Sequence, residues 1–119
     1  LRRRLILACQ QNGVGLLLGC DAPQVFNVPG FSTHNELKYL VDAGLTPYQA
    51  LRTGTVNVGQ YLNLPDVGII KPGAVADLIL IDGNPLADVT HTKKSSGVML
   101  RGQWLSKAEI EAGLKKYEK

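Results

Sequence analysis

The chain has 119 residues, of which 45% are hydrophobic and 19% charged, and its formal net charge is +3. This composition is typical of a globular domain, and the basic cluster at residues 2–4 lacks the interleaved aromatic side chains of a nucleic-acid surface. The apolar run after it is shorter than the roughly 7–15 residues of a signal-peptide core, and nothing approaches the roughly 18–20 apolar residues of a membrane span. We therefore expect no nucleic-acid or membrane partner. The number and spacing of Cys9 and Cys20 suggest neither a zinc site nor a disulfide framework, so we expect both to be reduced thiols in a cytoplasmic protein.

The first predicted elements are a helix and one buried strand. Residues 2–12 carry apolar side chains at helical spacing, and Asn12-Gly13 is a typical helix end. Residues 14–19 contain no charge, which indicates a strand buried on both faces, as in a parallel sheet covered by helices. Asp21 follows at the carboxyl end of that strand, where chemistry gathers in such sheets. It is a candidate base or metal ligand, although an Asp before Ala-Pro is often just a loop cap.

Three helices are predicted after the proline-rich loop that follows Asp21. Thr33 and Glu36 have the spacing of a capping box, which would start a helix that ends at Gly44. Thr46 is followed by proline and, three residues on, by glutamine, which predicts the start of a second helix. A third helical stretch covers residues 55–62. The spacing thus explains Glu36 as a capping carboxylate.

Beyond residue 64 the pattern changes to short strands and turns. The predicted elements are strands over 67–70 and 75–82, a Pro-Gly turn at 71–73, a hairpin around Arg101-Gly102, and a final helix opened by the capping box of Ser106 and Glu109. The chain therefore divides near residue 64 into an α/β half and a small antiparallel β unit with a terminal helix.

The strand over 14–19 poses a difficulty, because it is the only strand predicted in the first half. Its backbone needs a neighbouring strand on each edge, and its side chains need helices on both faces. Each large apolar side chain left half exposed would lose up to about 1.5–3 kcal/mol of burial free energy. For several such side chains this loss is comparable to the stability of a whole domain, roughly 5–15 kcal/mol. We therefore expect the chain to be the last part of a larger α/β protein, with exposed strand edges through which copies can self-associate.

Three parts of the chain resemble metal-dependent amidohydrolases, nearest to the imidazolonepropionase-like and Xaa-Pro dipeptidase-like branch. The matching stretches together span roughly residues 10–105. They are Gly19-Cys20-Asp21-Ala22-Pro23, similar to the Gly-Thr-Asp-Ala end of the eighth barrel strand; His34-Asn35-Glu36-Leu37 with Leu45-Thr46-Pro47 and Thr55-Val56-Asn57; and Val67-Gly68-Ile69-Ile70-Lys71-Pro72-Gly73 with Ala76-Asp77-Leu78 and Asp82-Gly83-Asn84-Pro85-Leu86. The last of these is the most specific.

The resemblance implies that the chain is a C-terminal fragment of a (β/α)8 TIM-barrel hydrolase. It assigns residues 1–64 to the last strand and helices of the catalytic barrel, and 65–119 to part of a composite β-sandwich with a C-terminal helix. It also implies one or two divalent metals, usually zinc, whose ligands are histidines and carboxylates of other strands and the Asp after the eighth. Only that last ligand is present here, as Asp21, with Cys20 in place of the usual Thr beside it.

The implied reaction is hydrolysis of a carbon–nitrogen bond in a small-molecule amide, lactam or dipeptide by a metal-activated water. Asp21 would be a metal ligand and the general base. His34 could line the substrate pocket, although a histidine at a helix entry is more often structural. Because a catalytic zinc needs three protein ligands and a water, we expect this fragment alone to hold no cofactor and to be inactive. The alternative is a non-catalytic structural or assembly module in which Asp21 is idle.

Overall fold

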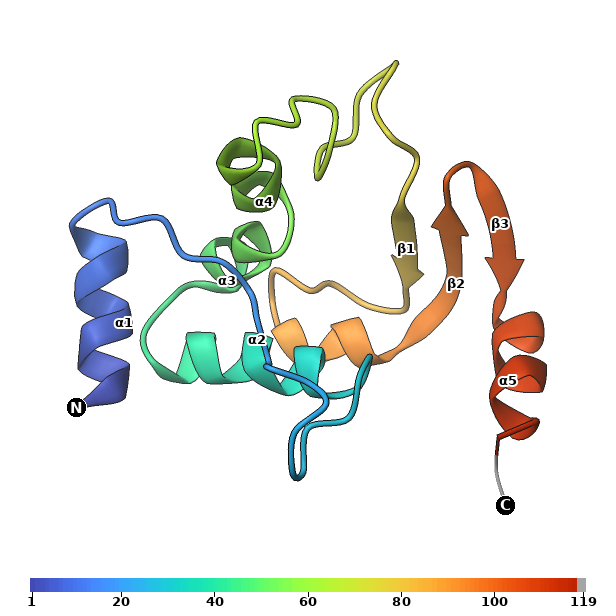
Figure 1. Ribbon diagram of the computed structural model, residues 1–119, viewed down its shortest axis with the longest axis horizontal. Helices are drawn as coiled ribbons and strands as arrows, with labels where there is room; N and C mark the ends of the chain where they lie inside the picture. The colour runs from blue at the N-terminus through green and yellow to red at the C-terminus, as the bar shows by residue number, and fades with distance from the viewer. Residues whose placement is uncertain (118–119) are drawn as a thin grey trace.

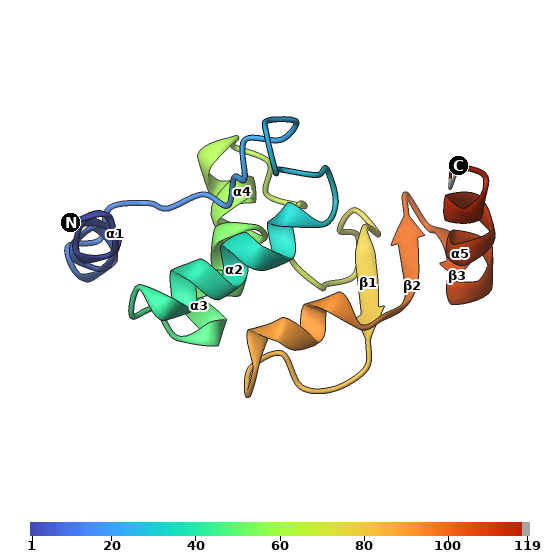
Figure 2. The same cartoon turned by 90° about the horizontal axis from the view of Figure 1, so that it is seen from below.

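The computed structural model describes residues 1–117 and places five α-helices, one 3-10 helix and a three-stranded sheet among them. The elements are α1 (Arg2–Gln11), α2 (Ser32–Asp42), α3 (Pro47–Thr53), α4 (Val56–Tyr61), β1 (Leu78–Ile81), η1 (Val89–Lys93), β2 (Ser95–Leu100), β3 (Gln103–Ser106) and α5 (Lys107–Lys115). Figures 1 and 2 show α1 at one end of the molecule and the sheet with α5 at the other. Over the residues described, no helix is long and apolar enough to cross a membrane.

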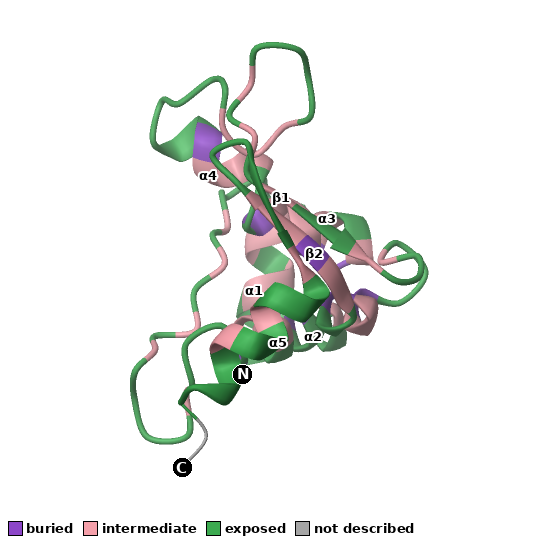
Figure 3. Cartoon of the chain, turned by 90° about the vertical axis from the view of Figure 1, so that its right-hand side faces the viewer, coloured by how far each residue is buried: buried purple, intermediate pink, exposed green. Residues whose placement is uncertain are grey.

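The hydrophobic core lies around α2. Leu37 and Leu40, one helical turn apart, pack with Leu45, Ala50 and Val89. Partly buried apolar side chains flank this cluster: Ile6, Leu16, Leu18, Val41 and Leu51. Since Val89 belongs to η1, both halves that the sequence distinguishes contribute to one core. Figure 3 shows how small the buried patches are among half-buried and exposed positions.

The described chain is more open than a compact domain of its length. Its Cα radius of gyration is 15.3 Å, against about 13.5 Å expected for a domain of this size. Large apolar side chains are exposed on most elements, among them Leu5, Leu17, Tyr61, Ile79, Trp104 and Leu114. Such a surface fits the expectation of a piece of a larger fold, in which other residues cover these side chains.

The predicted first helix is confirmed as α1. At its end the backbone N–H and the side-chain amide of Asn12 both donate to the Ala8 carbonyl, at 3.0 Å and 2.8 Å. Gly13 then takes a left-handed φ of +72°, as a glycine after a helix commonly does.

The strand predicted over 14–19 is wrong, because within the described chain no other strand pairs with this segment. It is fixed to helices instead: the Leu18 N–H donates to the Thr53 carbonyl at 3.0 Å, and the Asn57 side-chain amide donates to the Leu16 carbonyl at 2.9 Å. Burial on both faces is also wrong, since Val14 and Leu17 are 54% and 45% exposed. Leu16 and Leu18 pack against the core cluster, so one face of the segment is covered and the other is open.

The capping box predicted from Thr33 and Glu36 is wrong. α2 begins at Ser32, and its N-cap residue is Phe31, which makes no side-chain capping bond. The Ser32 hydroxyl accepts from the Val28 N–H at 2.8 Å, which ties the loop to the helix start. Thr33 and Glu36 therefore lie inside the helix, where neither is in position to cap it.

The capping box at α3 is confirmed. Thr46 Oγ1 accepts from the Gln49 N–H at 3.2 Å, and Gln49 Oε1 accepts from the Thr46 N–H at 2.9 Å. The helix predicted over 55–62 is also confirmed, as the slightly shorter α4.

The strand predicted over 67–70 is wrong, and irregular turns take its place. Gly68 has φ +76°, and a Cβ there would lie 2.3 Å from the Thr55 carbonyl oxygen, so the backbone itself packs against the start of α4. The predicted Pro-Gly turn is confirmed, because the Ala74 N–H donates to the Lys71 carbonyl at 3.1 Å. Gly73 has the positive φ, +84°, that a type II turn requires.

The sheet is antiparallel, with strand order β1-β2-β3. The strand predicted over 75–82 is shorter than expected, and Val98 of β2 pairs with Ile79 on one side and Leu105 on the other. Arg101 and Gly102 join β2 to β3 with φ values of +50° and +80°, the two positive φ angles of a type I′ turn. The predicted hairpin is therefore confirmed.

The final capping box is confirmed as well. Ser106 Oγ accepts from the Glu109 N–H at 3.3 Å, and the Glu109 carboxylate accepts from the Ser106 N–H at 2.8 Å. The Ser106 hydroxyl also donates to the Glu109 carboxylate at 2.6 Å, and this bond, followed by the one from the Ser106 N–H, holds the pKa of Glu109 below its usual value.

Candidate functional site

Asp21 lies just beyond the 14–19 segment, where the loop to α2 begins. Its φ of +51° is left-handed, a conformation that aspartate tolerates better than most residues. The Gln24 side-chain amide donates to Asp21 Oδ2, and the Asn27 N–H closes the loop by donating to the Gln24 carbonyl at 2.8 Å. The loop thus holds one carboxylate oxygen while Asp21 remains exposed. Gln24 is a contact that no sequence motif indicated.

Asp21 borders a cavity of about 320 Å³ between this loop and α2. The lining combines two carboxylates, two aromatic rings and small or polar groups: Gly19, Cys20, Asp21, Phe26, Asn27, Ser32, Asn35, Glu36 and Tyr39. The Asp21 side chain therefore lies beside a cavity and at the end of the segment, where a base or metal ligand was expected. Its role there stays a prediction.

Glu36 is the cavity residue that the sequence analysis missed. Instead of capping α2, it lies half-buried on the first turns of the helix, and burial raises the pKa of its carboxyl. Within the residues described, the ion pairs are Lys38–Asp42 and Lys71–Asp66, so neither involves Glu36. The signal that could have found it is the histidine-to-leucine motif at residues 34–37, in which the carboxylate was assigned to the cap.

His34 bonds to η1. Its Nδ1 lies 3.0 Å from Thr92 Oγ1, and the Thr92 hydroxyl donates its proton to the Val89 carbonyl at 2.8 Å. Nδ1 of His34 must therefore carry the proton and donate it. Burial, and after it the charge of Lys93, lowers the pKa of His34, so the ring is mostly neutral at pH 7. His34 joins α2 to η1, and a substrate-pocket role for it stays a prediction.

The residues described do not complete a metal centre. Among them, no group of three or more His, Cys, Asp and Glu side chains could hold a metal ion, whereas a catalytic zinc takes three protein ligands and a water. Asp21 and His34 bond to different elements, Gln24 of the loop and Thr92 of η1. Cys9 and Cys20 are free thiols.

Comparison with known proteins shows which protein family the chain belongs to. The model of the amidohydrolase family matches residues 2–105, so the chain belongs to that family. Hydrolases of this family act on carbon–nitrogen bonds and generally use divalent metals.

The particular relatives are enzymes of that class. An adenine deaminase from Thermosipho africanus is 33% identical over 64 residues, which are 54% of this chain and 11% of that protein. An imidazolonepropionase from Pyrobaculum arsenaticum is 51% identical over 39 residues, 33% of this chain and 10% of that protein. The chain thus spans about a tenth of these curated relatives.

Among solved structures, a Xaa-Pro dipeptidase with bound methionine in its active site is similar to this chain, with a TM-score of 0.77 and 25% identity. The match covers 87% of this chain and 25% of the dipeptidase. Because such neighbours are TIM-barrel amidohydrolases, the expected fold class is confirmed: the chain is part of this barrel fold and carries a small antiparallel sheet.

Proposed function

We propose that this chain is the C-terminal portion of a metal-dependent hydrolase whose substrate is a small amide, lactam or dipeptide. One observation carries the proposal: in a chain whose residues 2–105 match the amidohydrolase family, Asp21 follows the 14–19 segment and borders a cavity. Residues 1–64 supply the end of the barrel in this proposal, and 65–119 supply part of the β-sandwich. The two free cysteines support a cytoplasmic location.

Asp21 is the metal ligand and general base in this proposal. Gln24 engages Oδ2 and leaves Oδ1 to meet a ligand or a proton. A carboxylate in this position can accept a proton from an attacking water and return it to the leaving nitrogen. We propose zinc, one or two ions, for the complete enzyme. Its remaining ligands would come from other barrel strands, and we infer that the 119-residue chain alone is inactive.

A chimera tests this role. Residues 2–105 replace the corresponding part of the Xaa-Pro dipeptidase, and hydrolysis of a Xaa-Pro dipeptide is measured. We expect Asp21→Asn to lower kcat/KM by about 10²–10⁴-fold, the range for loss of a general base. Asp42→Asn is the matched control, because Asp42 pairs with Lys38 on the surface of α2, and it should leave kcat/KM nearly unchanged. A folded chimera whose rate ignores Asp21→Asn would favour the alternative, a structural module with an idle Asp21.

A further inference from the structure

A short apolar turn stands beside the cavity at Asp21. The Asn27 N–H donates to the Gln24 carbonyl at 2.8 Å, so Val25 and Phe26 are the two central residues of a β-turn. Figure 1 shows the loop that carries this turn projecting from the molecule near the start of α2. Phe26 lines the cavity together with Asp21, whereas Val25 does not. The turn therefore brings an aromatic ring to the cavity that the candidate metal ligand borders.

The backbone of Phe26 has an unfavourable conformation. Its φ is +68°, the left-handed value that a type II turn requires at this position and that glycine or asparagine normally supplies. For a bulky residue such a φ is an outlier. The ring gains little packing in return from the part of the chain that the structure describes, because Phe26 is 97% exposed. Strain of this kind is concentrated at active sites and ligand sites.

The loop is fixed on both sides of the turn. The Gln24 side-chain amide donates to Asp21 Oδ2, and the Val28 N–H donates to Ser32 Oγ at 2.8 Å, where α2 begins. The fold therefore presents the Phe26 ring at one defined place beside the cavity. A ring that is already in position loses little conformational freedom when a ligand binds to it.

The cavity at Asp21 combines this ring with a second aromatic ring and with two carboxylates. Tyr39 of α2 lines it, as do Asp21 and Glu36. Its volume of about 320 Å³ is at the lower end of the range for small-molecule pockets. One small ligand in it can therefore contact aromatic surface and the candidate metal ligand together.

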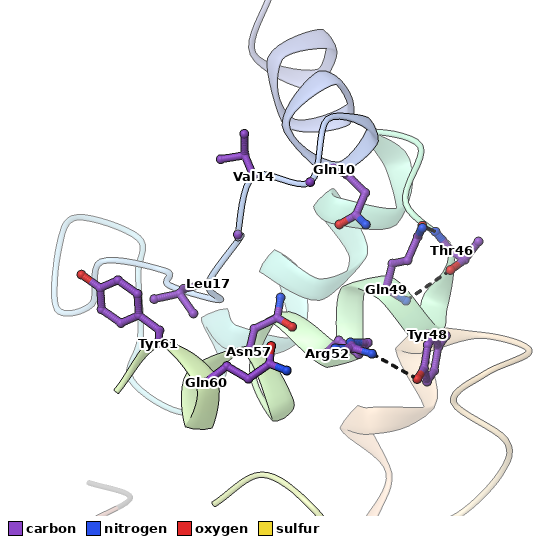
Figure 4. Close-up of a pocket in the computed structure, with 12 residues that line it drawn as sticks. Gln10, Val14, Leu17, Thr46, Tyr48, Gln49, Arg52, Asn57, Gln60 and Tyr61 are labelled. Carbon is purple, nitrogen blue, oxygen red and sulfur yellow. Dashed lines mark hydrogen bonds between the residues drawn. The ribbon is translucent and has the colours of Figure 1, made fainter. Parts of the chain in front are cut away.

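A second hollow, of about 720 Å³, is larger but lacks this combination. Figure 4 shows it between α1, the 14–19 segment, α3 and α4, with Tyr48 and Tyr61 in its lining. It shares no lining residue with the cavity at Asp21, and among the described residues its lining includes no carboxylate. Aromatic surface and the candidate catalytic carboxylate thus meet in the smaller cavity.

We propose that Phe26 is a specificity-determining residue whose ring binds a bulky apolar side chain of the substrate, next to the carbon–nitrogen bond that is hydrolysed. The inference rests on the proposed function, because it concerns the same site. Contact of such a side chain with Phe26 and Tyr39 removes apolar surface of both partners from water. The site therefore favours a substrate with an aliphatic or aromatic side chain over one with glycine at the same position.

The chimera with the Xaa-Pro dipeptidase tests this selection. Hydrolysis of Leu-Pro and Gly-Pro is measured, because these two dipeptides differ in one apolar side chain alone. We expect Phe26→Ala to lower kcat/KM for Leu-Pro about 10-fold, mainly by raising KM, and to leave kcat/KM for Gly-Pro within about twofold. Phe26→Leu keeps an apolar side chain and should retain most of the preference. Val25→Ala is the matched control, since Val25 lies in the same turn, is 82% exposed and does not line the cavity, and it should leave both values nearly unchanged.

The proposal is overturned if Phe26→Ala lowers kcat/KM equally for the two dipeptides, or if Phe26→Ala and Val25→Ala behave alike. A chimera that hydrolyses neither dipeptide counts against the proposed function and not against the selection. A smaller graft then decides the selection: residues 21–31 alone replace the corresponding loop of the dipeptidase. The ratio of kcat/KM for Leu-Pro to that for Gly-Pro should fall about 10-fold when the graft carries Phe26→Ala, and an unchanged ratio would overturn the proposal.

Thermal melting of the 119-residue chain gives a second measurement that does not depend on hydrolysis. Because Phe26 is exposed, Phe26→Ala should leave the melting temperature within about 3 °C of that of the parent chain. Phe26→Gly also removes the ring and suits the left-handed φ, so it should melt no lower than Phe26→Ala. A fall beyond this range in both variants would show that the ring packs within the fold, and would overturn the proposal.

Discussion

The β2–β3 hairpin and the 14–19 segment both contain short apolar stretches, yet only the hairpin forms strands. Arg101 and Gly102 provide a turn that brings β2 and β3 together within a dozen residues. The 14–19 segment has no such local partner, and its hydrogen bonds go to Thr53 and Asn57. In a hairpin the two strands that pair are neighbours in the sequence, so the turn sets their pairing. A barrel strand pairs with strands that lie far away in the sequence.

The largest expected effect is a difference in the free energy of unfolding between a substitution in the core and one in the 14–19 segment. Leu40 is 5% exposed and Leu17 is 45% exposed. Leu40→Ala should lower the free energy of unfolding by about 2–5 kcal/mol, the usual result of a cavity in a core. Leu17→Ala should lower it by less than about 1 kcal/mol. Urea denaturation of the two variants measures the difference, and equal losses would mean that the segment is already packed on both faces.

A smaller effect is expected in the hairpin turn. Gly102 has φ +80°, so Gly102→Ala forces an L residue into the left-handed region and should cost about 1–2 kcal/mol. Gly113 is the matched control, because it lies in α5, and a Cβ there meets nothing within 4 Å. Gly113→Ala should stabilise the chain by roughly 0.5–1 kcal/mol. Thermal melting of both variants checks the opposite signs, and a shared sign would contradict the turn assignment.

The two threonines with capping-box spacing should differ. Thr46 bonds to the Gln49 N–H, so Thr46→Ala should cost about 1 kcal/mol. Thr33 lies inside α2 and caps nothing, so Thr33→Ala should stay within about 0.5 kcal/mol. Chemical denaturation measures the free energy of unfolding of both variants. An equal loss in the two would indicate that Thr33 caps α2, against the structure.

The smallest effect is a pH dependence at His34. Burial and Lys93 hold the pKa of His34 below its usual 6.5 in the folded chain. As the pH falls, His34 is therefore protonated in the unfolded chain before it is protonated in the folded chain. The contribution of neutral His34 to the stability of the fold is complete above about pH 6.5 and is lost as the pH falls below that value. The free energy of unfolding should drop more between pH 7.5 and 5.5 in the parent chain than in His34→Gln. Identical drops would show that His34 is not held neutral.

Local chemistry could be predicted from the sequence. The caps at Thr46 and Ser106 and the turn at Gly73 depend on residues no more than four positions apart, and all three are present. Thr33 has the same spacing as Thr46, but α2 begins two residues earlier than a cap at Thr33 would place it, with Phe31 as its N-cap and the Ser32 hydroxyl bonded to Val28. Spacing alone does not say where a helix starts.

Features that depend on distant contacts could not be predicted. Residues 67–70 carry a strand-like pattern, but Gly68 packs against the Thr55 carbonyl and no strand forms. Glu36 enters the cavity only because the loop brings Asp21 back over α2. The contribution of η1 to the core follows from its packing on α2, with His34 bonded to Thr92 across that contact. Apart from Glu36, which belongs to the motif at residues 34–37, none of these contacts has a signature within a short stretch of sequence.

The zinc content of the purified 119-residue chain is the most direct measurement. After equilibration with zinc and removal of the excess, we expect far less than one ion per chain and no hydrolysis of amides or dipeptides. One tightly held zinc per chain, together with hydrolysis, would show that these 119 residues hold a complete metal centre. That result would contradict the account, in which Asp21 is their single metal ligand.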